Sequence, residues 1–226
     1  MRTKIEKYKE WYIPENDNPG KKLIRDGFQC IPSLNIAIRH VKKFHKAIDV
    51  GAWIGDSTVF LSEKFDQVIA FEANPITFES CIKNIKERKI ENVVVNQIGI
   101  SNQIGQKQLY SRLKSTNSAW LSDAEPPTNI ATMQPINIQT TTLDELNIPD
   151  VDFIKIDVDS HEGFVILGGM NWLSENSPIV MIENKRVSHN RQSDMPEPDY
   201  LLRKCGYGYY GQIGKADFIY RKIMKR

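Results

Sequence analysis

From Lys46 to the end of the chain, short apolar segments alternate with longer amphipathic ones. The apolar runs lie in "KAIDVG", "QVIAFE", "ENVVVNQIGIS", "VDFIKIDV" and "PIVMIEN", and helix-like segments follow most of them. Strands that are apolar on both faces are typical of a parallel sheet covered by helices on both sides. The pattern predicts an α/β fold with a mostly parallel sheet, to which "GYYGQIG" and "ADFIYRKI" add an antiparallel C-terminal hairpin.

The 226 residues suit one domain with a short appendage. We expect residues 1–45 to form an N-terminal cap segment, with a helix in "IPSLNIAIRHVKKFH", and residues 46–226 to form the main domain. The polar stretch 102–133 is long for a connector, so it contains either short strands of its own or a functional flap. "HEGFVILGGMNWLSE" predicts one helix.

The charge balance argues against nucleic acid as the main partner. Thirty basic and 28 acidic residues leave a net charge of +2. No apolar run is long enough to cross a bilayer, and the N-terminus lacks the apolar core of a secretory signal. The cysteines at 30, 81 and 205 are odd in number and far apart, which favours neither disulfides nor a zinc site, so we expect a reducing cytoplasm.

In a parallel sheet of this kind, ligands bind at the carboxyl ends of the strands. The first strand is followed by "DVGAWIGDST", where Gly51 and Gly55 allow a tight turn and close approach of a ligand, although an ordinary connecting turn has the same look. Asp56 or Ser57 is expected to be the N-cap of the next helix.

Glu72 ends the second strand, about twenty residues after the first glycine, where an acid can accept both hydroxyls of a ribose. The alternative is a surface glutamate that caps the next helix. The turn is G-x-x-x-G, not the dinucleotide G-x-G-x-x-G, and the acids Asp49 and Asp56 flank it. They disfavour a pyrophosphate and favour a cationic or zwitterionic ligand, such as the methionine end of S-adenosylmethionine (SAM), so a nicotinamide oxidoreductase is the weaker interpretation.

Five blocks of the chain together resemble the FkbM-type family of SAM-dependent methyltransferases. They are "IDVGAWIGDST", "VIAFEANPITFESCIKNI", "TTLDEL", "VDFIKIDVDSHEGFVILGG" and "PIVMIE", within residues 46–185. The resemblance implies the seven-stranded, Rossmann-like class I methyltransferase fold and an enzyme that methylates hydroxyl groups on sugars and natural products.

The resemblance also implies the cofactor site. Glu72 would bind the ribose, Ile98 and Gly99 would lie against the adenine, and Asp157 would lie near the methionine end and the methyl group. The implied cofactor-binding residues are Asp49, Gly51, Ala52, Trp53, Gly55, Asp56, Ser57, Glu72, Ala73, Ile98, Gly99 and Asp157. The chain departs from the family at Trp53 (usually asparagine), at Ala73 (often proline) and in "DVDSHE" (usually "DVEGAE"), which leaves the substrate class open.

Methyl transfer to a hydroxyl requires close positioning of the acceptor and removal of a proton. The candidate catalytic residues are Asp157, His161 and Glu183, of which His161 titrates nearest neutrality. Asp159 and Glu162 are better explained as acids that cap the start of the following helix.

A divalent metal is a further alternative. Asp157, Glu183 and Asn184 carry oxygen donors of the kind that Mg²⁺ prefers, an arrangement that resembles metal-dependent catechol and macrolide-sugar O-methyltransferases. The alternative role of Glu183 is to bind substrate, and the polar stretch 183–194 is a candidate acceptor-binding loop.

The sequence thus favours a SAM-dependent O-methyltransferase that acts on a glycan or another hydroxylated small molecule. The alternatives are methylation of a protein or nucleic acid and a non-catalytic SAM-binding module. The "[DN]PP[YFW]" signature of amino-group methylation is absent after the fourth strand, where "DVDS" stands. The sequence leaves the acceptor and the oligomeric state open.

Overall fold

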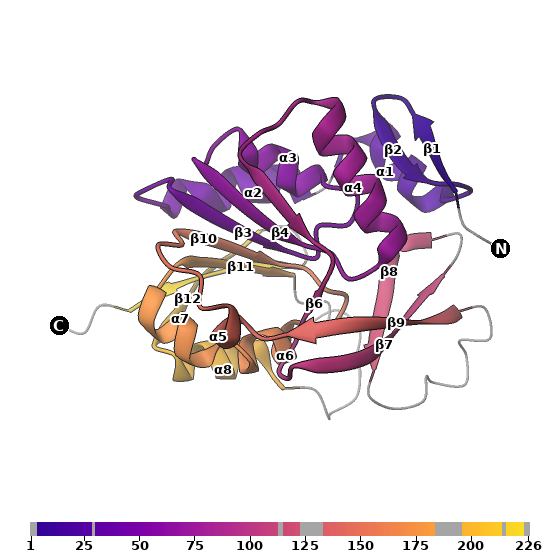
Figure 1. Cartoon of the computed structure of the whole chain (residues 1–226). Helices are drawn as coiled ribbons and strands as arrows, with labels where there is room; N and C mark the ends of the chain where they lie inside the picture. Colours follow the sequence, from indigo (N-terminus) through magenta and orange to yellow (C-terminus); the bar gives the residue numbers. More distant parts are fainter. Residues whose placement is uncertain are drawn as a thin grey trace.

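The chain is built around a seven-stranded sheet with the order β12-β13-β11-β10-β3-β4-β5 (Figure 1). The computed structural model describes residues 4–28, 30–112, 115–122, 133–183, 196–213 and 216–223. The strands are β3 (Lys46–Val50), β4 (Gln67–Phe71), β5 (Val93–Asn96), β10 (Phe153–Ile156), β11 (Ile179–Glu183), β12 (Tyr207–Ile213) and β13 (Asp217–Lys222). The first five run parallel, while β13 is antiparallel to both β11 and β12, as the apolar pattern and the C-terminal hairpin predict.

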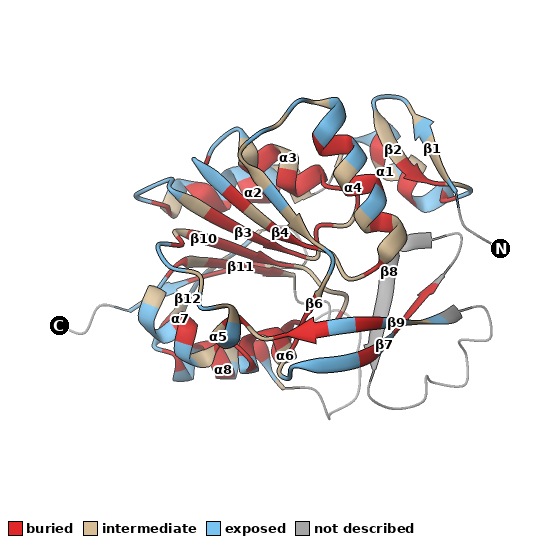
Figure 2. Ribbon diagram, viewed as in Figure 1, coloured by how far each residue is buried: buried red, intermediate tan, exposed pale blue. Residues whose placement is uncertain are grey.

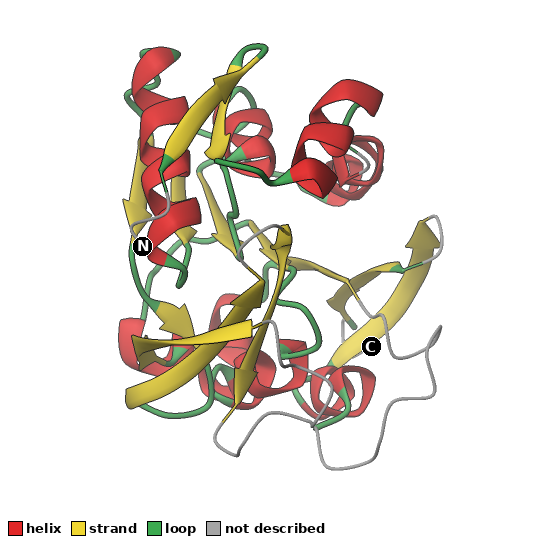
Figure 3. Cartoon of the chain, turned by 90° about the vertical axis from the view of Figure 1, so that its right-hand side faces the viewer, coloured by secondary structure: helices red, strands yellow, loops and turns green. Residues whose placement is uncertain are grey.

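Helices cover both faces of this sheet (Figures 1 and 3). One layer contains α2 (Cys30–Ala37), α3 (Asp56–Ser62) and α4 (Pro75–Glu87), and the other contains α5 (Leu143–Leu146), α6 (Glu162–Leu167), α7 (Met170–Asn176) and α8 (Pro198–Lys204). The central strands are buried on both faces (Figure 2), because each layer contributes apolar side chains to its own core. Within the described residues, no helix has the length and apolar character that crossing a bilayer requires.

Two predicted helices differ from the observed ones. The segment after His161 forms α6 and α7 instead of one helix, because the chain breaks at two glycines that lie close to neighbouring elements. A side chain at Gly168 would meet the carbonyl oxygen of Ser101 at 2.1 Å. The helix expected in the N-terminal cap is also shorter, since α2 ends at Ala37 and a single 3-10 turn covers Ile38–His40.

The N-terminal segment packs directly on the sheet and its helices. A hairpin of β1 (Ile5–Tyr8) and β2 (Trp11–Pro14) precedes α1 (Asn18–Asp26). Asn84 of α4 anchors the hairpin, because its side chain accepts the Tyr12 N–H at 2.7 Å and donates to the Tyr12 carbonyl at 2.9 Å. Leu34 of α2 belongs to the same apolar cluster as Phe153 of β10. A boundary at residue 45 stays a prediction.

A second, four-stranded sheet lies beside the first, with the order β6-β9-β7-β8 (Figure 1). Its strands are β6 (Gly99–Ile100), β7 (Gly105–Arg112), β8 (Ser115–Ser122) and β9 (Met133–Thr141). The described part of the stretch 102–133 therefore forms strands, which is one of the two alternatives that its length left open. "INIQTTTLDEL" forms the end of β9 and α5.

Candidate cofactor and active site

A pocket of about 360 Å³ opens at the carboxyl ends of β3, β4, β10 and β11. Parallel strands bring their carboxyl ends to one edge of the sheet, and the loops that follow them line the cavity. Most of the predicted site residues line it: Gly51, Trp53, Asp56, Ser57, Glu72, Ala73, Ile98, Gly99, Asp157, His161 and Glu183. The structure thus brings together residues that lie more than a hundred positions apart in sequence.

Gly51 lies where the β3 loop meets the end of β10. Its φ is +84°, a left-handed conformation that side chains rarely adopt, and a Cβ on it would lie 1.9 Å from the carbonyl oxygen of Asp157. The Gly51 N–H also donates to the Phe71 carbonyl at 3.0 Å. The loop is therefore packed against two neighbouring strand ends at a position that only glycine fills.

Asp49, Ala52 and Gly55 do not line the pocket, although the sequence placed them in the cofactor loop. Gly55 is the N-cap of α3 in a left-handed conformation, so the prediction of Asp56 or Ser57 as N-cap is wrong. Asp49 is fully buried beneath the loop, where it accepts the hydroxyls of Ser57 and Thr58, both at 2.7 Å. These three residues belong to the loop and its support but do not face the pocket.

Glu72 is half-buried at the end of β4 and lines the pocket. Its carboxylate accepts the backbone N–H of Trp53 at 2.8 Å and of Asn74 at 2.9 Å. Burial raises the pKa of Glu72 to about 7, against the lowering effect of these hydrogen bonds. Asn74, and not Glu72, is the N-cap of α4, because its side chain accepts the Ile76 N–H at 3.1 Å. Glu72 is thus a fixed acceptor that faces the cavity.

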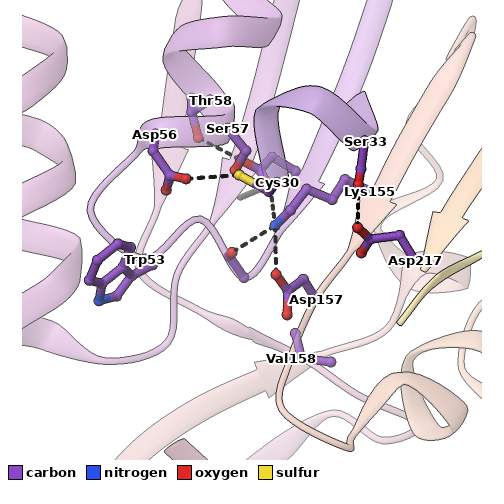
Figure 4. A network of polar contacts seen from close by, with 12 residues as sticks. Cys30, Ser33, Trp53, Asp56, Ser57, Thr58, Lys155, Asp157, Val158 and Asp217 are labelled. Carbon is purple, nitrogen blue, oxygen red and sulfur yellow. Dashed lines mark hydrogen bonds and ion pairs between the residues drawn. The ribbon is translucent and has the colours of Figure 1, made fainter. Parts of the chain in front are cut away.

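Lys155 is a pocket residue that the sequence analysis missed. It lies on β10, only 3% exposed, and its Nζ is 3.2 Å from Asp49 Oδ1 and 3.6 Å from Asp157 Oδ2 (Figure 4). Burial lowers the pKa of Lys155, but Asp49 and Asp157 outweigh it and raise the pKa well above its ordinary value. A lysine inside the apolar run "DFIKID" is the signal that could have identified it.

Cys30 is a second missed residue, and it comes from the N-terminal segment. Its thiol donates to Asp56 Oδ2 at 3.0 Å (Figure 4), and Leu23 and Phe28 of the same segment also line the pocket. Burial raises the pKa of the Cys30 thiol, so this cysteine stays protonated. Burial also raises the pKa of Asp56 to about 6. The N-terminal segment therefore forms one wall of the pocket.

The acidic cluster after β10 divides between two roles. Glu162 is the first residue of α6, where an acid suits the helix dipole, but the prediction that it caps the helix is wrong because the N-cap is His161. Its Oε1 accepts the N–H of Val158 at 3.2 Å and of Ser160 at 3.1 Å, in the turn before the helix. Burial, and to a smaller extent the Asp157 charge, raises its pKa to about 7 against the lowering effect of its hydrogen bonds. The same prediction for Asp159 is wrong, because the N-cap is His161 and Asp159 lies in the preceding turn, where it lines the pocket.

Carboxylate oxygens of Asp157, Glu162 and Glu183 lie within 4.8 Å of one another. Such a group of oxygen donors suits a hard divalent cation, with Glu162 in addition to the predicted Asp157 and Glu183. The third predicted metal ligand, Asn184, lies outside the described residues, as does most of the stretch 183–194.

His161 lines the pocket but is largely buried, with 4% of its surface exposed. Its Nε2 is 2.9 Å from the hydroxyl of Ser101, and that hydroxyl donates to Asn102 Oδ1 at 3.2 Å. The ring also packs on Phe164, at a centroid distance of 4.7 Å. Ser101 therefore fixes the orientation of the imidazole beside the cavity.

Comparison with known protein families identifies the fold and the family. Residues 49–209 match the model of the methyltransferase FkbM domain, which spans the glycine loop, Glu72 and the acidic cluster. The chain belongs to the FkbM family of methyltransferases. This confirms the expected family and enzyme class, in which SAM is the methyl donor.

Solved structures support the same fold. The FkbM methyltransferase from Methylobacillus flagellatus KT is 17% identical with a TM-score of 0.51, and the match covers 78% of this chain but only 43% of that protein. A SAM-dependent methyltransferase from Aquifex aeolicus is 16% identical with a TM-score of 0.50 over 90% of this chain and 97% of its own. The class I methyltransferase fold is thereby confirmed, while a comparison with curated proteins gives no match.

Proposed function

We propose that this FkbM-family enzyme transfers the methyl group of SAM to a hydroxyl group of a sugar, a glycan or a related small molecule. The observation that carries the proposal is the single cavity that Glu72, Asp157 and His161 share. It offers an acceptor for the ribose hydroxyls, a carboxylate at the methionine end and an imidazole for proton removal in one continuous space.

In this proposal, the cofactor extends from Ile98 and Gly99, against the adenine, past Glu72 at the ribose, to Asp157 near the methyl group. All four residues line the pocket, and the strands that they follow lie in the sheet order β5-β4-β3-β10, which supports this path. The acceptor hydroxyl approaches from the ends of β10 and β11, where His161 or Asp157 takes its proton as the oxygen attacks the methyl carbon. The C–S bond breaks in the same step and leaves S-adenosylhomocysteine (SAH).

A Mg²⁺ ion at the acceptor end is a second possibility, favoured by the convergence of three carboxylates. Asp157 and Glu183 would hold it, with Glu162 beside them, and it would supply positive charge to orient an acceptor oxygen. The hydrogen bonds from Val158 and Ser160 to Glu162 Oε1 leave its other oxygen for such a role. Transfer that is unchanged by a chelator would exclude this ion.

A screen with methyl-labelled SAM over glycans, small hydroxylated molecules, nucleotides and peptides tests the proposal. We expect label on a hydroxyl of a glycan or small molecule, and loss of the label with His161→Ala or Asp157→Asn. Label on a protein or nucleic acid would contradict the acceptor class. SAM binding without transfer to any class would favour a non-catalytic binding module.

A further inference from the structure

Lys155 connects the cofactor loop to the acidic cluster. Its Nζ donates to Asp49 Oδ1 at 3.2 Å and to the Gly51 carbonyl at 3.3 Å, and it lies 3.6 Å from Asp157 Oδ2 (Figure 4). Its side chain is 4% exposed, so the charge is removed from water and depends on these acceptors. The ammonium group thus offsets negative charge on both Asp49 of β3 and Asp157 after β10.

The charge balance matters because the cofactor changes charge during the reaction. SAM carries a positive sulfonium, whereas SAH is neutral at the sulfur, so a carboxylate near the sulfur favours SAM. The Asp157 carboxylate is one-third exposed to the cavity on one side and paired with Lys155 on the other. Lys155 therefore offsets part of the negative charge that faces the sulfur.

We propose that Lys155 is a positioning residue that holds Asp157 in place and offsets its charge, and so limits the preference of the pocket for cationic SAM over neutral SAH. The inference rests on the proposed position of Asp157 near the methyl group. It also has a catalytic rationale, since the sulfonium charge is lost in the transition state. An interaction that stabilises this charge in the reactant state would raise the barrier to transfer.

The test is the ratio of the dissociation constants of SAH and SAM, measured by calorimetry without an acceptor. The variant is Asp49→Asn with Lys155→Met, which removes the buried pair together and leaves no uncompensated buried charge. We expect the ratio of the SAH to the SAM dissociation constant to rise about tenfold, because Asp157 then faces the sulfonium without the offsetting Lys155 charge. A ratio within about twofold of wild type would overturn the inference.

Adding Asp157→Asn to this variant shows whether Lys155 acts through Asp157. We expect the added substitution to abolish the increase, whereas a persistent increase would overturn the proposed route. Glu79→Gln with Lys86→Met is the control, since both residues are exposed on α4 and the pair of substitutions leaves the net charge unchanged, as the test variant does. We expect this control to leave the ratio at the wild-type value.

A further variant covers the case in which the double substitution prevents folding. Asp157→Asn alone keeps Lys155 paired with Asp49. We expect it to lower the ratio of the SAH to the SAM dissociation constant about tenfold, so that the preference for SAM weakens. An unchanged ratio there would also overturn the inference. If wild-type protein binds no SAM, the proposed function falls and the inference falls with it. If the wild type binds SAM but the substitutions leave the ratio of the SAH to the SAM dissociation constant unchanged, only the role of Lys155 is overturned.

Discussion

At the ends of β3 and β4, Asp49 and Glu72 accept hydrogen bonds from hydroxyl and N–H groups that the loop and α3 hold in place. At the ends of β10 and β11, by contrast, carboxylates of Asp157, Glu162 and Glu183 converge within 4.8 Å of one another. The first end is built for stability, and the second concentrates like charge that disfavours folding but is available for chemistry. Substitution of Gly51 or Asp49 should therefore lower stability, whereas substitution of Glu162 should raise it.

Gly51→Ala, at the β3–β4 end, should cause the largest loss of stability. The new Cβ meets the Asp157 carbonyl oxygen and the residue keeps a φ of +84°, so both strain and a backbone clash oppose folding. We expect the free energy of unfolding to fall by about 3–5 kcal/mol in urea titrations.

Gly211→Ala is the matched control, because a Cβ at Gly211 has no heavy atom within 4 Å. We expect it to change the free energy of unfolding by less than about 1 kcal/mol. Equal losses in the two glycine variants would contradict the close packing of the loop against β10.

Asp49→Asn should be the next most damaging change. The amide retains an oxygen for the Ser57 and Thr58 hydroxyls but no longer compensates the buried Lys155 charge. We expect a loss of about 3 kcal/mol, measured by chemical denaturation. Adding Lys155→Met should recover at least half of it, and no recovery would show that the ion pair is not the cause.

Glu162→Gln should have a smaller effect of opposite sign, at the β10–β11 end. The pKa of Glu162 is raised from 4.5 to about 7, chiefly by burial, so the folded protein keeps a proton that the unfolded chain releases between these pH values. The free energy of unfolding of the wild type should therefore fall as pH rises from 4.5 to about 7.

Glutamine retains an oxygen for the Val158 and Ser160 N–H groups but carries no charge. We expect the variant to lose part of this pH dependence. At pH 8 its free energy of unfolding should exceed that of the wild type by on the order of 1 kcal/mol, measured from unfolding curves across pH. An unchanged slope would show that Glu162 does not contribute to it.

The parts of the fold that depend on local pattern were predictable from the sequence. The apolar runs gave the sheet, and the position of a residue just after a strand identified Glu72, Asp157 and Glu183 as pocket residues. Gly51 was predictable because a tight strand-to-helix turn requires residues that tolerate a positive φ.

The parts that depend on contacts distant in sequence were not predictable in this way. Cys30 meets Asp56 only because the N-terminal segment folds back over the pocket, and Lys155 meets Asp49 only through the pairing of β10 with β3. The N-cap of α3 was assigned wrongly because the helix begins directly after Gly55, whose left-handed conformation favours glycine over a residue with a capping side chain.

Binding of SAM in the pocket beside Glu72 is tested most directly by calorimetry. SAM and NAD are each titrated into three folded proteins: the wild type, Glu72→Ala and Glu79→Ala. Glu79 is the control, an exposed acid on the neighbouring helix α4. We expect the wild type to bind SAM and Glu72→Ala to weaken this binding about 10-fold to 100-fold, because hydrogen bonds to a carboxylate are lost. Glu79→Ala should leave the SAM affinity unchanged. Preferential binding of NAD, or equal SAM affinity in all three proteins, would contradict the account.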